Sequence, residues 1–137
     1  MATPLFRWVQ KKVDFCAVAV DKFIYIAGGV EMPTGRDALA ECARFDTEEN
    51  MWQAIAPLAE ARRSPLGVNR NDNIFIAGGE GVPGHLMLLK TCEVYNILTD
   101  EWQFIASLTA SGFWGTIFAL DKKLYVLGGY TRKPGNN

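Results

Sequence analysis

"IYIAGG" (Ile24 to Gly29), "IFIAGG" (Ile74 to Gly79) and "LYVLGG" (Leu124 to Gly129) are three apolar segments that each end in a glycine pair. The spacing between them is 50 residues each time. Between residues 21–58 and 71–108, thirteen aligned positions are identical. Segments that recur at one fixed spacing of this length indicate a repeat architecture, so the chain is interpreted as copies of one unit.

Aromatic residues occupy matching positions in the two whole copies of the unit. Phe45 aligns with Tyr95, and Trp52 aligns with Trp102, within "WQAIAPL" and "WQFIASL". Large aromatic side chains at fixed positions are suited to filling the space between stacked sheets. The positions expected to define the repeat are Gly28, Gly29, Phe45, Trp52, Gly78, Gly79, Tyr95, Trp102, Gly128 and Gly129.

Each unit predicts four short strands. The first strand is expected at Phe15 to Val20, Pro65 to Asn69 and Gly115 to Leu120, and a two-residue turn joins it to the apolar run before the glycines. The third strand is expected at Glu41 to Phe45 and Thr91 to Tyr95, and the fourth begins at Trp52 or Trp102. By propensity "RDALAECARF" and "HLMLLKTCEVY" are also good helix formers, so a βαβ unit is the alternative. The aromatic pairs favour the hairpin, because seven residues across a polar turn places them opposite each other.

The amino-acid composition argues against several classes of function. The 137 residues carry 14 basic and 15 acidic side chains, and this balance predicts neither nucleic-acid nor membrane-surface binding. No apolar run approaches the length that crosses a bilayer, and a cytoplasmic protein is expected. Cys16, Cys42 and Cys92 have no metal-ligand spacing and are expected to be buried thiols. With His85 as the single histidine, no metal site, cofactor or catalytic set is expected.

Four-stranded antiparallel sheets of this size cannot bury their faces alone, so they must stack on one another. Radial stacking of such sheets gives a β-propeller, and the fold class expected is all-β. Glycine pairs at the strand ends permit dihedral angles and close backbone approaches that other residues cannot adopt.

The pattern of apolar strand, Gly-Gly, aromatic residue and tryptophan resembles the Kelch repeat. The segments "FDTEENMW" and "YNILTDEW" also resemble the end of the Kelch unit, although Thr47 and Ile97 stand where the family usually has proline. The resemblance covers nearly all of residues 1–137. It implies a leading strand at about residues 5–10, around Trp8, whole repeats at 15–56 and 65–106, and a half repeat at 115–130.

Kelch propellers usually close with five to seven blades, so this set implies part of a ring. The expectation is a fragment or short isoform of a longer protein, or assembly of several copies. Open stacks expose apolar faces and sheet edges, which predicts self-association.

The strand directions place two sets of loops on one face. The post-glycine loops are Val30 to Ala40 and Glu80 to Lys90, and the inter-repeat loops are Pro57 to Ser64 and Ser107 to Trp114. The resemblance implies that this face binds a protein or peptide. Arg63 is interpreted either as a carboxylate-binding fork or as solvated charge, and Arg62 as a residue that holds its loop. Glu48 and Glu49 are interpreted as solvated charge on the opposite face. The candidate partner-binding residues are Val30, Glu31, Arg63, Ser64, Glu80, His85, Phe113, Trp114 and Tyr130, with Val13 and Asp14 as weaker candidates.

The resemblance implies a substrate-recognition module of a BTB–Kelch-like adaptor for a cullin–RING ubiquitin ligase. An actin or cytoskeletal scaffold is the alternative within the same class. The alternative from another class is a small-molecule enzyme built on a Kelch-like propeller.

"GGEGVPGH" (Gly78 to His85) contains a GxGxxG spacing after an apolar run. A dinucleotide-binding loop would need a following helix and a parallel strand. The aligned copy has Glu31 and Thr34 in place of the last two glycines, so only the glycine pair recurs. The segment is therefore interpreted as a strand end followed by a loop, with Glu80 and His85 available to a protein partner.

Overall fold

The computed structural model describes residues 11–81, 87–111 and 113–130. These residues form strands and no helix, so the βαβ alternative is wrong and the all-β class is confirmed. The strands are β1 (Lys12–Val13), β2 (Cys16–Val20), β3 (Phe23–Ala27), β4 (Val30–Glu31), β5 (Cys42–Asp46), β6 (Met51–Ile55), β7 (Leu66–Arg70), β8 (Asn73–Ala77), β9 (Cys92–Asn96), β10 (Glu101–Ile105), β11 (Phe113–Leu120) and β12 (Lys123–Tyr130).

Two sheets are complete four-stranded antiparallel blades. The first has the order β2-β3-β5-β6, and the second has the equivalent order β7-β8-β9-β10. Phe45 pairs with Trp52 and Tyr95 pairs with Trp102, which confirms that these aromatic residues face each other across a hairpin. β11 and β12 form the third sheet, and β1 pairs with β4 in a fourth.

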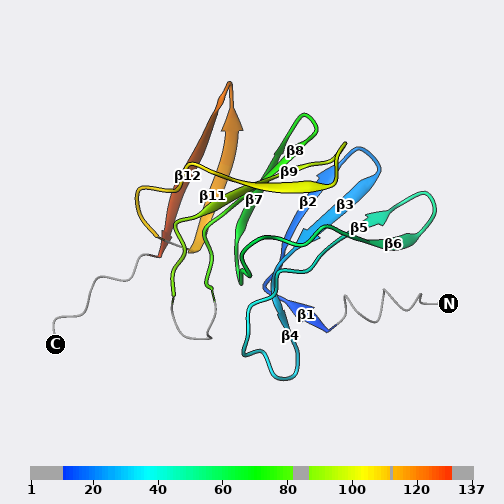
Figure 1. The fold of residues 1–137 in the computed structure, drawn as a ribbon, viewed down its shortest axis with the longest axis horizontal. Coiled ribbons are helices and arrows are strands. Elements are labelled where there is room, and N and C mark those ends of the chain that lie inside the picture. Colours follow the sequence, from blue (N-terminus) through cyan, green and yellow to red (C-terminus); the bar gives the residue numbers. More distant parts are fainter. Residues whose placement is uncertain (1–10, 82–86, 112, 131–137) are drawn as a thin grey trace.

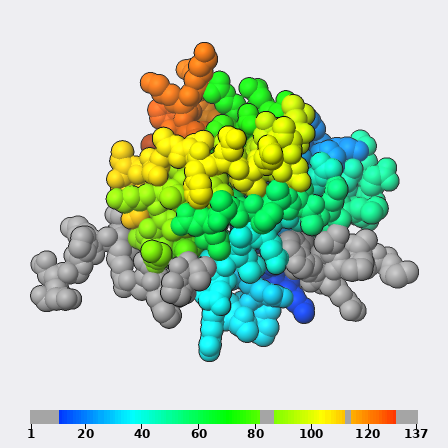
Figure 2. All heavy atoms as spheres, viewed as in Figure 1, coloured from blue at the N-terminus to red at the C-terminus, as the bar shows by residue number. Residues whose placement is uncertain are grey.

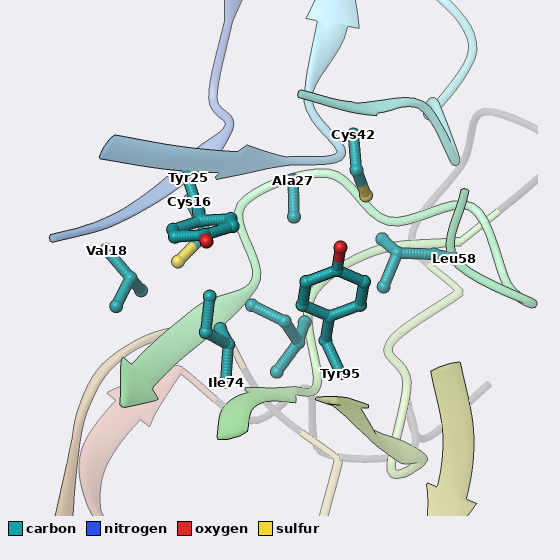
Figure 3. Close-up of a cluster of buried hydrophobic side chains, with 9 residues drawn as sticks. Cys16, Val18, Tyr25, Ala27, Cys42, Leu58, Ile74 and Tyr95 are labelled. Carbon is teal, nitrogen blue, oxygen red and sulfur yellow. The ribbon is translucent and has the colours of Figure 1, made fainter. Parts of the chain in front are cut away.

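The blades stack through their first strands, since β2 contacts β7 and β7 contacts β11 (Figure 1). Gly67 in β7 lies so close to β2 that a Cβ atom there would approach Sγ of Cys16 to 2.2 Å. The main core fills the space between the two whole blades. Tyr25 and Cys16 of the first blade face Ile74 and Tyr95 of the second (Figure 3). The sheets are thus held by side chains that alternate along each strand.

Residues with positive φ recur at the same positions of the unit. The first residue of each two-residue turn, Asp21, Asn71 or Asp121, has φ of 52°. All six glycines of the three pairs also have positive φ, between 62° and 98°. The glycine pairs are therefore required by backbone geometry, because side chains are strained in this region.

Strand bounds differ slightly from those expected. β7 spans residues 66–70 rather than 65–69, and β11 starts at Phe113 rather than Gly115, because Phe113 pairs with Tyr130. The strand expected at residues 5–10 lies outside the described residues. None of the described residues belongs to a helix that could span a membrane.

Candidate functional site

The ends of the inter-repeat and post-glycine loops meet at the lower end of the molecule in Figure 1, opposite the β2–β3, β7–β8 and β11–β12 turns. In Figure 2 the first post-glycine loop, in cyan, projects from this end. One residue from each type of loop pairs with the other in every repeat: Val13 with Val30, Arg63 with Glu80, and Phe113 with Tyr130. The candidate residues from two loops are thereby brought together in pairs.

The residue after each of these paired positions has a left-handed backbone. φ is 56° at Asp14, 50° at Ser64 and 60° at Trp114. Asp tolerates this conformation, whereas a bulky residue there is a true outlier. The recurrence shows that the bend belongs to the repeat. It presents the side chains at these three positions at the start of each first strand.

Arg63 is held by the preceding repeat. Its Nε donates to Oδ2 of Asp14 at 3.1 Å, and the backbone N–H of Ser64 donates to the Asp14 carbonyl at 2.8 Å. Both side chains of the ion pair are a little over a third exposed. Among the described residues, the terminal nitrogens of Arg63 make no further hydrogen bond, so the fork that suits a carboxylate remains available.

Arg62, next to it in sequence, is fully buried and makes five hydrogen bonds with the second blade. Nε and Nη2 donate to Oε2 of Glu93 at 3.1 and 3.0 Å. Nη1 donates to the carbonyls of Gly78 and Thr91, and Nη2 to Oγ1 of Thr91. Glu93 is also fully buried and accepts from the N–H groups of Ala59 and Glu60 in the same loop. A buried pair with all its polar atoms satisfied fixes the loop.

The backbone of Arg62 binds the first blade. Its carbonyl accepts from Gly29, and its N–H donates to Leu39. A Cβ atom on Gly28 would lie 2.3 Å from the Arg62 carbonyl oxygen, so only glycine fits there. Arg62 therefore holds its loop, as expected from the sequence, and through this loop it also joins the two blades.

The other candidates differ in accessibility. Val30 lies in β4 and is only 1% exposed, so its side chain cannot meet a partner and its assignment to partner contact is corrected. Glu31 is exposed, Ser64 and Glu80 are half-buried, and Trp114 is 72% exposed. Phe113 and Tyr130 lie at paired strand ends. His85 lies outside the described residues. Glu48 and Glu49 lie in the β5–β6 turn at the opposite end.

Glu93 is the residue of this region that sequence reasoning missed. The available signal was an acidic residue in "TCEVY", at a position that shares the buried face of Tyr95. Its partner, Arg62, lies 31 residues away, so the pair itself is not visible in the sequence.

Cysteine and carboxylate side chains are the groups in the described part of the chain that could ligate a metal ion or act as nucleophiles. No group of three or more His, Cys, Asp or Glu side chains there could hold a metal ion. Cys16, Cys42 and Cys92 are buried free thiols, and burial raises the pKa of Cys16 and Cys42 to about 12. Thiols with such pKa values are poor nucleophiles at neutral pH.

Comparisons with known proteins agree with this arrangement. A model of the Kelch motif matches residues 61–109. An F-box/kelch-repeat protein of Arabidopsis thaliana is 35% identical over 119 residues, covering 86% of this chain and 31% of the relative. Kelch-like protein 26 of Danio rerio is 32% identical over 119 residues, covering 84% and 19%. Kelch-like protein 38 of Mus musculus is 28% identical over 115 residues, covering 82% and 19%.

Stacked four-stranded antiparallel blades with glycine-pair strand ends define a repeat protein of the β-propeller class. The chain belongs to the Kelch-repeat family and carries a partial set of the family's repeats. It spans about a third or less of the length of these curated relatives. Kelch repeats and these relatives support a protein-interaction module with protein partners.

Proposed function

We propose that the chain recognises a protein or peptide at the face formed by the paired loop ends. In this proposal it acts in the cytoplasm as the substrate-recognition part of a cullin–RING ubiquitin ligase adaptor. The observation that carries the binding face is the recurrence of the same backbone pairing, 13 with 30, 63 with 80 and 113 with 130, in every repeat. The adaptor role is supported by the relatives, whose names include F-box/kelch-repeat and Kelch-like proteins.

Arg63 supplies the polar recognition in this proposal. Asp14 fixes the guanidinium through Nε, and the two terminal nitrogens remain for a ligand. A guanidinium with two parallel N–H groups binds a carboxylate in a bidentate manner. The partner segment is therefore proposed to carry an Asp or Glu side chain that meets Arg63.

Trp114 supplies the apolar anchor. Trp114 occupies the position in its repeat that Ser64, the neighbour of Arg63 in sequence, occupies in the preceding repeat. The first strands of these two repeats, β7 and β11, are in contact. Tryptophan and arginine are the residue types most enriched among side chains that dominate binding energy at protein interfaces. An acidic residue followed by an apolar residue would match the two side chains.

Affinity capture from cell lysate tests this function. The chain, Arg63→Ala and Trp114→Ala are compared by mass spectrometry, with Glu48→Ala in the β5–β6 turn as the matched control. Partners should be lost with both face variants and kept with the control. If both face variants retain every partner, the binding face is wrongly placed. If the captured partner's ubiquitination in cells does not depend on this protein, the adaptor role is wrong.

A further inference from the structure

Two aromatic rings of the second blade are in contact. Tyr95 of β9 and Trp102 of β10 pair across the hairpin, and their ring centroids lie 4.9 Å apart at an interplanar angle of 37°. Tyr95 is 2% exposed and lies in the core shown in Figure 3, whereas Trp102 is only half-buried. Rings at this distance interact directly, and an electron passes between touching side chains far faster than between distant ones. A path for one electron therefore joins an accessible indole to a buried phenol.

The phenol of Tyr95 has a base within reach. Its hydroxyl donates to Oδ1 of Asp100 at 2.7 Å, and a base must lie at hydrogen-bond distance from the proton that it takes. The pKa of Asp100 is lowered, first by the hydrogen bond from the Ala56 N–H and then by that from Tyr95, so the carboxylate is ionised at neutral pH. Burial raises the pKa of Tyr95, so the phenol keeps its proton as long as it is not oxidised. Asp100 is exposed, so a proton that it accepts can exchange with water.

The indole of Trp102 donates to an amide carbonyl instead of a base. Its N–H lies 2.7 Å from the carbonyl oxygen of Ala56, which does not accept a proton at neutral pH. An oxidised indole held in this way keeps its proton, and the gain of one electron restores it. A phenol that loses an electron and a proton together is easier to oxidise at neutral pH than an indole. The geometry therefore favours transfer of an electron from Tyr95 to oxidised Trp102.

The first blade has the same ring geometry without the phenol and the carboxylate. Phe45 and Trp52 lie 5.0 Å apart at an interplanar angle of 42°. Asn50 takes the place of Asp100, with φ of 53° against 54°. The first blade is therefore an internal control for a function that needs the hydroxyl of a tyrosine and an adjacent carboxylate.

We propose that Tyr95 is a redox-active tyrosine that is oxidised by one electron through Trp102. A soluble radical oxidant takes one electron from the indole of Trp102 and is itself reduced by that electron. Tyr95 then gives one electron to the oxidised indole, and its phenol proton moves along the hydrogen bond to Oδ1 of Asp100. The products are a neutral tyrosyl radical, a protonated Asp100 and Trp102 in its original form.

The second blade thereby moves one oxidising equivalent from its surface into its core. The three side chains belong to the β9–β10 hairpin and not to the paired loop ends, so the inference does not depend on the function proposed above.

Pulse radiolysis of the whole 137-residue chain tests this step. The oxidant is the azide radical, which oxidises tryptophan in preference to tyrosine. The absorption of the tryptophan radical should decay as that of a tyrosyl radical rises, at a rate that does not depend on protein concentration and is slower in D₂O than in H₂O. Asp100→Asn keeps a side-chain oxygen for both hydrogen bonds but removes the base, so it should slow this phase by about tenfold or more.

Matched variants locate the radical. Tyr95→Phe introduces the side chain that Phe45 already has in the first blade, and it should abolish the concentration-independent phase. Trp102→Phe should abolish it as well, whereas Trp52→Phe should leave it unchanged. Tyr25→Phe is the control for a second buried tyrosine, whose ring lies 6.1 Å from that of Tyr95 and whose hydroxyl bonds to no carboxylate in the part of the chain that the structure describes.

Three results would overturn the proposal. They are the absence of a tyrosyl radical, a tyrosyl phase that Tyr95→Phe leaves unchanged, and an equal rate of tyrosyl formation in Asp100→Asn and the unsubstituted protein. The Tyr95 and Asp100 variants decide the matter if Trp102→Phe does not fold.

Discussion

Arg62 and Arg63 show how surroundings decide what identical residues do. Arg62 is completely buried among carbonyls and the carboxylate of Glu93, whereas Arg63 makes one side-chain ion pair at the surface. A charged side chain that is buried away from water must be paired and fully hydrogen-bonded. An ion pair exposed to solvent contributes little to the stability of the fold. The first arginine therefore stabilises the fold, and the second is available for binding.

Arg62→Met should lower the free energy of unfolding by about 3–5 kcal/mol, because it leaves the buried carboxylate of Glu93 without its cation. Urea unfolding followed by circular dichroism measures this loss. Arg63→Met is the control and should cost about 1 kcal/mol or less. Similar losses for the two variants would contradict the assignment of separate roles.

Trp114 has φ of 60°, and the equivalent position of the first repeat has Asp14. Trp114→Asn should raise the free energy of unfolding by about 1 kcal/mol, because asparagine tolerates the left-handed region better than a bulky side chain does. Thermal unfolding measures the change. The reciprocal variant Asp14→Trp should be destabilised, and a stable Asp14→Trp would show that no strain exists at this position.

Among the elements, the β9–β10 hairpin forms two hydrogen bonds with Ala56, the residue that follows β6 of the first blade. The N–H of Ala56 donates to Oδ1 of Asp100 at 2.9 Å, and its carbonyl accepts from Trp102. Asp100 also accepts from the hydroxyl of Tyr95 at 2.7 Å. The hairpin therefore adds directional bonds to the apolar contact between blades.

Trp102→Phe should cost about 1–2 kcal/mol, because the Ala56 carbonyl loses its donor. Trp52→Phe is a matched control at the same position of the first blade, where no indole hydrogen bond occurs among the described residues. The difference between the two variants in urea unfolding isolates the hydrogen bond. Equal losses would mean that ring volume alone matters.

The pKa of Asp100 is lowered from 3.8, first by the hydrogen bond from the Ala56 N–H and then by that from Tyr95. A carboxyl group with a lowered folded-state pKa stabilises the fold above its unfolded pKa, and this contribution is lost as the pH falls through the folded value. The Tm difference between the protein and Asp100→Asn should therefore be largest near neutral pH and should shrink below about pH 4. A difference that stays constant with pH would exclude this linkage.

The strands were largely predictable from the sequence, because the copies of the repeat can be aligned with one another. The hairpin partners Phe45 with Trp52 and Tyr95 with Trp102 followed from spacing alone. The burial of Val30 was not predictable, because Val30 pairs with Val13, which precedes β2 and β3 in the sequence. Its apolar character, against Glu80 and Tyr130 at equivalent positions, was the one signal. Pairs distant in sequence, such as Arg62 with Glu93, require the folded structure.

For the whole molecule, the outer face of the β11–β12 sheet has the largest consequence. Phe118, Leu120, Tyr125 and Leu127 are between 43% and 62% exposed on it, and they correspond to Val18, Val20, Tyr25 and Ala27 of the interface between whole blades. Exposed apolar patches of this kind favour association.

The protein should therefore self-associate in a concentration-dependent manner in sedimentation velocity. Phe118→Lys combined with Leu127→Lys should reduce the association, because both charges lie on this face. Leu98→Lys, at a 77% exposed position in the β9–β10 turn, is the control and should leave it unchanged. A monomer at all concentrations would contradict the prediction.

The backbone pairing of loop ends also bears on how the protein can acquire new specificities. Hydrogen bonds between main-chain groups join Arg63 and Glu80, and they do not depend on which side chains these residues carry. Exposed positions on this face, such as Glu31, Arg63 and Trp114, can therefore be exchanged without dismantling the scaffold. A library randomised at these sites would consist mostly of folded proteins that differ in what they bind, so ligand preference in this architecture can drift faster than stability.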